Sequence, residues 1–211
     1  MNKTIAKEIL NILEELYPKA GTELFFRSPY ELLVSTILSA QCTDVRVNQV
    51  TSKLFIKYNT PLKMLELSQE DLEKLIFSCG FYKNKAKNIL ATSKILVEKY
   101  AGEVPNTMEE LRLLPGVGRK TANVVGAVAF NIPAIAVDTH VFRVANRIGL
   151  ATAKNELGTE LALMKLIPKD HWLHAHHLII WHGRRLCHSR SPKCSACPLS
   201  IYCRYYKKNE Q

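Results

Sequence analysis

Residues 114–121 read Leu-Pro-Gly-Val-Gly-Arg-Lys-Thr, and this stretch constrains the fold more than any other in the chain. Leucines precede it, and small residues at 122, 126 and 127 follow it in a pattern that allows close helix packing. Gly116 and Gly118 can take positive φ angles, and so short a segment leaves room only for a tight turn. The stretch therefore predicts a helix, a glycine-rich turn and a second helix that begins near Gly118.

Helices are predicted over most of the remaining chain, because apolar residues recur at spacings of three and four. The expected helices cover 5–16, a segment that starts at 28–29, 44–58, 68–76, 84–100, 107–113, a segment after 138, and the histidine-rich run 171–177. Residues 132–137 are apolar, but Pro133 argues against a strand and favours a buried connector. The histidine run is interpreted as helix without a metal. With no alternating strand pattern, the chain is expected to be all-α.

A phosphate suits the start of the second hairpin helix, where free N–H groups and the helix dipole attract anions. The 29 Lys and Arg residues outnumber the 19 Asp and Glu residues and give a net charge of +10, which fits a nucleic-acid partner. An ordinary helical hairpin and a basic protein without such a partner remain as alternatives.

Lys120 has two interpretations, a phosphate contact or a nucleophile. A nucleophilic amine must lose its proton, and partial burial and the positive end of a helix would both disfavour the ammonium form. Asp138 could take that proton, although its charge also stabilises the ammonium. Asp138 or Thr139 is also expected to cap the helix that follows, and the two roles of Asp138 are compatible.

Four cysteines near the C-terminus have the spacing Cys187-x6-Cys194-x2-Cys197-x5-Cys203. Four thiolates this close in sequence could bind zinc or an iron–sulfur cluster, and His182 and His188 are alternative ligands. The other two cysteines, Cys42 and Cys79, are isolated on apolar stretches and are expected to be small buried side chains rather than reactive thiols. No apolar run matches a signal peptide or a membrane span, so we expect a cytoplasmic protein without disulfides.

These motifs together resemble the endonuclease III family, the helix–hairpin–helix DNA glycosylase/AP lyases of base excision repair. The resemblance rests on 114–123, 137–143, Leu-Ser-Ala-Gln at 38–41, Thr-Asp at 43–44, Gly-Glu-Val-Pro at 102–105 and the cysteine spacing, and it extends over almost the whole chain. It implies that Lys120 and Asp138 are catalytic and that the four cysteines hold one 4Fe–4S cluster with a structural role.

The resemblance also implies two helical domains. One is a continuous six-helix domain over 22–132 that ends in the helix–hairpin–helix, and the other joins 1–21 to 133–211 and carries the cluster. DNA is expected to bind in the groove between them, with Lys120 and Asp138 on opposite walls.

Further residues are expected to contact DNA. Gln41 matches the family residue that fills the gap left by a flipped nucleotide. Phe81 stands where the family usually has a smaller aliphatic residue that wedges into the duplex, so its aromatic ring could stack there instead; alternatively it packs between loops. The remaining expected contacts are Gly116, Gly118, His140, Arg190 and Lys193.

The implied function is a bifunctional glycosylase/AP lyase. It would excise oxidised pyrimidines from double-stranded DNA and cut abasic sites by β-elimination through a Lys120 Schiff base, acting as a monomer. Two alternatives stay open: a monofunctional mismatch glycosylase of the same fold, and a non-enzymatic helix–hairpin–helix DNA-binding protein. The lysine at 120 argues against the first.

Overall fold

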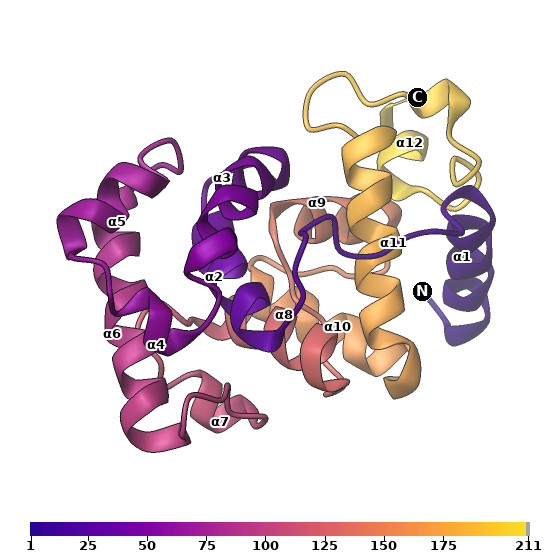
Figure 1. The fold of residues 1–211 in the computed structure, drawn as a ribbon. Coiled ribbons are helices and arrows are strands. Elements are labelled where there is room, and N and C mark those ends of the chain that lie inside the picture. Colours follow the sequence, from indigo (N-terminus) through magenta and orange to yellow (C-terminus); the bar gives the residue numbers. More distant parts are fainter. Residues whose placement is uncertain (210–211) are drawn as a thin grey trace. The chain divides into compact units, whose positions relative to one another are not determined.

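The regular secondary structure of the chain is helical throughout the residues that the computed structural model describes, which are 1–209 (Figure 1). The predicted all-α class is therefore confirmed for these residues. They form two compact units. One consists of Met1–Thr22 and Pro133–Gln211, whose last two residues lie outside the described part, and the other is the continuous segment Glu23–Ile132. Within the described chain, no helix has the length and apolar character needed to cross a bilayer.

The continuous unit is built around α2 (Pro29–Ser39), whose residues from 30 to 38 are all buried. Ser28 caps this helix by accepting a hydrogen bond from the N–H of Glu31 at 3.2 Å, and Pro29 occupies the first turn, as the sequence predicted. The other helices are α3 (Asp44–Lys57), α4 (Pro61–Met64), α5 (Gln69–Ile76), α6 (Tyr82–Tyr100), α7 (Met108–Leu111) and α8 (Arg119–Phe130). Because α2 is apolar on almost every face, it must lie at the centre of the unit, where α3, α6 and α8 pack around it.

The discontinuous unit joins the two ends of the chain through α11 (Trp172–Arg185), which packs against both α1 (Lys3–Leu16) and α9 (Thr139–Ile148) (Figure 1). Ile9 and Leu13 of α1 are fully buried in this core. The unit also contains α10 (Glu156–Leu166), α12 (Arg204–Asn209) and the 3₁₀ turns η1 (Lys169–His171) and η2 (Cys194–Ala196).

Most helices begin within two residues of the predicted positions, because their caps are encoded locally. The histidine-rich run forms η1 and the start of α11, and residues 134–137 are a buried connector without strand structure, both as predicted. Helices α4, α10 and α12 were not predicted. In α10, Leu157 and Leu161 are exposed whereas Thr159 and Glu160 are buried, so its apolar residues do not mark its buried face.

Candidate catalytic and nucleic-acid site

The glycine-rich turn lies between α7 and α8, and its backbone is held on both sides. Leu114 and Val117 are buried in the core of the continuous unit, and the hydroxyl of Thr92 on α6 donates to the carbonyl of Pro115 at 2.8 Å. Gly116 has a φ of +77°, and a Cβ built there would lie 2.9 Å from the Cβ of Asn88. Glycine is therefore required at 116 both for backbone conformation and for packing against α6.

Gly118 has a different role in the turn. Its φ is −81° and it is the N-cap of α8, so of the two turn glycines only Gly116 uses the positive φ that glycine permits. A Cβ added at 118 would meet no heavy atom within 4 Å. The missing side chain at 118 therefore leaves open space over the first N–H groups of α8, which suits the close approach of a phosphate.

Lys120 is the second residue of α8 and its side chain is exposed. Of the two conditions expected from the sequence, partial burial is therefore not met, whereas the position near the N-terminus of a helix is.

Gln41 and Phe81 lie in two neighbouring loops of the continuous unit, 40–43 and 77–81, which we call the paired loops. The paired loops are adjacent, because a Cβ added at Gly80 would lie 3.9 Å from the carbonyl oxygen of Gln41. Gln41 and Phe81 both have left-handed backbones, with φ values of 53° and 56°. Non-glycine residues adopt this conformation rarely, and such strain gathers at functional sites.

The exposure of these side chains agrees with a role in binding. Gln41 is exposed, and Phe81 is 68% exposed, so the alternative that Phe81 packs between loops is wrong. An exposed aromatic ring on a strained backbone is available to stack on a nucleobase.

Asp138 belongs to the discontinuous unit, where it caps α9. Its Oδ1 accepts a hydrogen bond from the N–H of Val141 at 2.8 Å, so the cap is Asp138 and not Thr139. Asp138 as a whole is half-buried. The capping bond fixes the carboxylate in one orientation, as a catalytic group requires.

His140 follows Asp138 in the first turn of α9. Burial lowers the pKa of His140, and the Arg143 guanidinium, whose Nη2 lies 3.2 Å from the His140 Nδ1, lowers it further, while Asp138 acts in the opposite direction. A contact between His140 and DNA stays a prediction.

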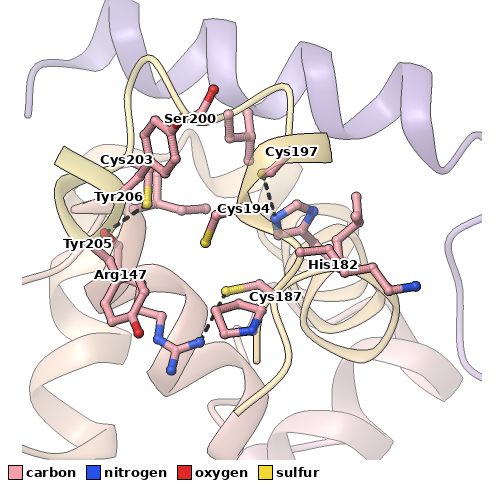
Figure 2. Close-up of a pocket in the computed structure, with 14 residues that line it drawn as sticks. Arg147, His182, Cys187, Cys194, Cys197, Ser200, Cys203, Tyr205 and Tyr206 are labelled. Carbon is pink, nitrogen blue, oxygen red and sulfur yellow. Dashed lines mark hydrogen bonds between the residues drawn. The ribbon is translucent and has the colours of Figure 1, made fainter. Parts of the chain in front are cut away.

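All four C-terminal cysteines line one pocket in the discontinuous unit (Figure 2). Arg147 donates from Nη1 to the sulfur of Cys187 at 3.6 Å, and His182 Nε2 lies 3.6 Å from the sulfur of Cys197. Burial lowers the pKa of His182 to about 4, so the ring is neutral at pH 7. Its Nδ1 lies 3.2 Å from the Tyr17 hydroxyl, so both ring nitrogens have a hydrogen-bonding partner.

These surroundings test whether the cysteines could hold a cofactor. Four thiols around one pocket, with the Arg147 guanidinium donating to one sulfur and the His182 ring next to another, fit the ligand set of an iron–sulfur cluster. Among residues 1–209, no three Cys, His, Asp or Glu side chains are arranged to hold a single metal ion.

Two arginines of α9 hold the cysteine loop, and the sequence did not reveal their role. Arg143 donates to the carbonyl oxygens of Gly183 and Cys187, at 2.9 Å from Nη2 to Gly183 and at 3.0 Å from Nη2 to Cys187. Arg147 donates to the carbonyl oxygen of His188 at 2.7 Å. Their spacing of four residues places them on one face of α9, which is a visible signal, but the sequence does not show their partners about forty residues away.

Arg190 and Lys193 are exposed on the same loop. They lie beyond the carbonyl groups that Arg143 and Arg147 hold, so the loop presents positive charge on a fixed backbone. Such charges attract a phosphate backbone without reading its sequence.

Comparison with known proteins connects these features to a family. A family model described as "HhH-GPD superfamily base excision DNA repair protein" matches residues 34–169. Endonuclease III of Escherichia coli strain K12 is 49% identical over 208 residues, which is 99% of each chain. Endonuclease III of Bacillus subtilis strain 168 is 49% identical over 203 residues, covering 96% of this chain and 93% of the relative.

Solved structures give the same relation. A trapped endonuclease III–DNA covalent intermediate matches with a TM-score of 0.95 and 48% identity over the whole of both chains. A thermostable thymine-DNA glycosylase matches with a TM-score of 0.84 and 26% identity over 96% of each chain.

Proposed function

Because the chain belongs to the endonuclease III family, and is thus a bifunctional glycosylase/lyase of base excision repair, we propose that Lys120 is its nucleophile. The observation that carries the proposal is the position of Lys120 in the first turn of α8, directly after a glycine turn shaped for a phosphate. A DNA backbone held at Gly118 would bring a sugar within reach of the amine at 120. A lysine amine is the group that forms Schiff bases with carbonyl carbons.

In the proposed reaction, the neutral Lys120 amine attacks C1′ of the damaged nucleotide. The bond between C1′ and the base breaks, and the base leaves with the bonding electron pair. The sugar ring then opens to a Schiff base, which acidifies the C2′ proton, and removal of that proton expels the 3′ phosphate by β-elimination. Asp138 assists by accepting a proton or by stabilising positive charge on the sugar, since its capping bond holds the carboxylate in place.

DNA binding in this proposal rests on three groups of residues. The turn residues Gly116 and Gly118 shape the phosphate site, and the loop residues Arg190 and Lys193 add backbone contacts. Gln41 and Phe81 enter the duplex from the paired loops and hold the gap open while the target base is turned out of the stack. The expected substrates are oxidised pyrimidines and abasic sites in double-stranded DNA, acted on by a cytoplasmic monomer.

Cys187, Cys194, Cys197 and Cys203 would hold one 4Fe–4S cluster. The cluster supplies a covalent cross-link between parts of a polar loop. Arg143 and Arg147 connect that loop to α9, whose N-cap is Asp138, so the helix that presents the carboxylate also holds the basic loop.

Borohydride trapping tests the role of Lys120. Borohydride reduces a Schiff base to a stable amine, so the protein incubated with abasic-site DNA should give a covalent adduct. Lys120→Ala should give none. Lys120→Arg keeps the positive charge and should bind DNA without forming the adduct, which separates the nucleophile from a phosphate contact. Lys53→Ala is the matched control, because Lys53 is an exposed lysine on α3 outside the proposed site.

Two outcomes would decide against this mechanism. Strand cleavage without an adduct in the unmodified protein would exclude the Schiff base. Release of a mismatched base without an adduct or strand cleavage would favour a monofunctional mismatch glycosylase, the activity class named for the thymine-DNA glycosylase at 26% identity.

A further inference from the structure

The two cysteines outside the C-terminal loop lie one in each of the paired loops. Cys42 follows Gln41 in loop 40–43, and Cys79 precedes Gly80 in loop 77–81. They are separated by 37 positions in the numbering, yet the backbones next to them are adjacent, since a Cβ added at Gly80 would lie 3.9 Å from the carbonyl oxygen of Gln41. Cys79 is buried, as the sequence predicted, and Cys42 is only partly so.

The two thiols differ in access to solvent. Cys79 is fully buried in the core of the continuous unit, whereas Cys42 is partly exposed at its edge. Burial, and then the neighbouring Cys42, raise the pKa of Cys79 to about 11, so Cys79 is a protonated thiol at pH 7. An accessible thiol beside a buried one is the arrangement of an attacking cysteine and its resolving partner.

A buried lysine faces the same pair. Lys85 is 5% exposed, and its Nζ donates to the carbonyl oxygen of Leu38 at 2.9 Å. Burial lowers the pKa of Lys85, while both thiols act in the opposite direction. Because Leu38 lies four residues before Cys42, the bond from Lys85 places a basic side chain next to the loop that carries the exposed thiol.

We propose that Cys42 and Cys79 form an oxidisable dithiol site for hydroperoxides, and that its disulfide ties the paired loops together. The Cys42 thiolate attacks the peroxide oxygen, the O–O bond breaks, and hydroxide leaves from hydrogen peroxide, giving a sulfenic acid at Cys42. The Cys79 sulfur then attacks that sulfenic sulfur. The S–O bond breaks, the Cys79 proton goes to the departing hydroxyl, and water leaves. Two thiols are oxidised while one peroxide is reduced.

The disulfide would change the geometry of the residues beside it. A disulfide holds its sulfurs about 2.05 Å apart, closer than two unbonded sulfurs can approach, so it restrains the backbones of the two loops. Gln41 and Phe81 each lie within two residues of a bridged position and already have strained backbones. This consequence rests on their proposed role in DNA binding, whereas formation of the bridge does not.

Peptide mapping of the holoprotein tests the bridge. Trypsin places Cys42 in the peptide 28–46 and Cys79 in the peptide 75–83, and neither contains another cysteine. After treatment with hydrogen peroxide and alkylation of free thiols, we expect these two peptides joined with the loss of two hydrogen atoms. Dithiothreitol should separate them, and Cys42→Ser should prevent the joined product. Cys42 is the preferred site for the variant because its side chain is only partly buried.

The same samples test the effect on the loops. Affinity for a duplex with a stable abasic-site analogue should fall about tenfold on oxidation, a change of about 1.4 kcal/mol, and recover with dithiothreitol. Cys42→Ser should bind this duplex like the reduced protein, and peroxide should not lower its affinity through a disulfide. Because peroxide also attacks iron–sulfur clusters, visible absorbance is followed throughout, and the affinity of Cys42→Ser after peroxide corrects for cluster damage.

Several results would overturn the inference. Oxidation of Cys42 to sulfinic acid without joined peptides would show that Cys79 does not resolve the sulfenic acid. Joined peptides without a change in affinity would refute the restraint on the loops. A failure of the proposed function is distinguishable, because it would appear in the reduced protein as an absent borohydride adduct.

Discussion

Replacing either turn glycine by alanine separates folding from DNA binding. At Gly116 the added methyl would lie 2.9 Å from Asn88 Cβ, and alanine would have to adopt a φ of +77°. A left-handed backbone costs a non-glycine residue about 1–2 kcal/mol, and overpacking costs about 1–3 kcal/mol. Because these effects overlap when the turn shifts, we expect Gly116→Ala to destabilise the continuous unit by about 2–4 kcal/mol.

For a chain of this size, 1 kcal/mol corresponds to about 2–4 °C in Tm, so Gly116→Ala should lower the Tm by about 5–15 °C. Gly118→Ala is the matched control. Gly118 has a φ of −81°, and the added methyl meets no atom within 4 Å, so the substitution only replaces a glycine N-cap by a poorer alanine N-cap. The Tm should therefore change by less than about 4 °C.

For DNA affinity we expect the substitution at Gly118, and not only the one at Gly116, to have a clear effect. The Gly118 methyl would occupy the open space over the first N–H groups of α8, so Gly118→Ala should weaken binding to abasic-site DNA about tenfold while the fold is retained. Calorimetric melting and fluorescence anisotropy give the two readouts. A Gly116→Ala protein that melts within 2 °C of the parent would refute the strain and clash reasoning, since ~1 kcal/mol is then its upper limit.

Three other perturbations address residues of the discontinuous unit. Asp138→Asn should keep the α9 cap and the Tm but lose most glycosylase activity, whereas Asp138→Ala should also lose about 1 kcal/mol of stability; equal melting of the two variants would contradict the cap. Burial lowers the pKa of His177 from 6.5 to about 3, so as the pH falls the unfolded chain binds this proton before the folded protein does. The protein should therefore lose stability below about pH 6.5, by about 3 kcal/mol at pH 4. In acid titrations followed by circular dichroism, His177→Gln should reduce that loss. The lysine in Arg147→Lys cannot reproduce the contacts of a guanidinium with the carbonyl groups of both His188 and Ser189. The visible absorbance of the proposed cluster should therefore decay faster in this variant on exposure to air. An unchanged decay would show that Arg147 does not secure the loop.

The positions of the helices could be predicted because caps and periodicity are local. Ser28 with Pro29, and Asp138 before α9, each satisfy backbone groups within three residues, so the signal is complete within a short window of sequence. Helix α10 was not predicted, because its apolar residues do not mark its buried face. Its buried face contains Thr159 and Glu160, which only their tertiary neighbours make favourable.

The candidate site was predictable as a set of residues and not as an arrangement. The motif identified Lys120, but its exposure depends on what packs around the first turn of α8. The two turn glycines look alike in sequence, yet only Gly116 has a positive φ and lies against α6, whereas the space beside Gly118 is open.

The sequence by itself determined the helical class, the capped helix starts, the glycine turn before Lys120 and the spacing of the four cysteines. The tertiary structure alone decided which distant groups meet. It brought the loop of Cys42 against the loop of Cys79, directed Lys85 to the carbonyl of Leu38, and directed Arg147 toward the cysteine loop. Local patterns reflect hydrogen bonds over three or four residues, whereas these contacts depend on how whole helices pack, which no short stretch of sequence encodes.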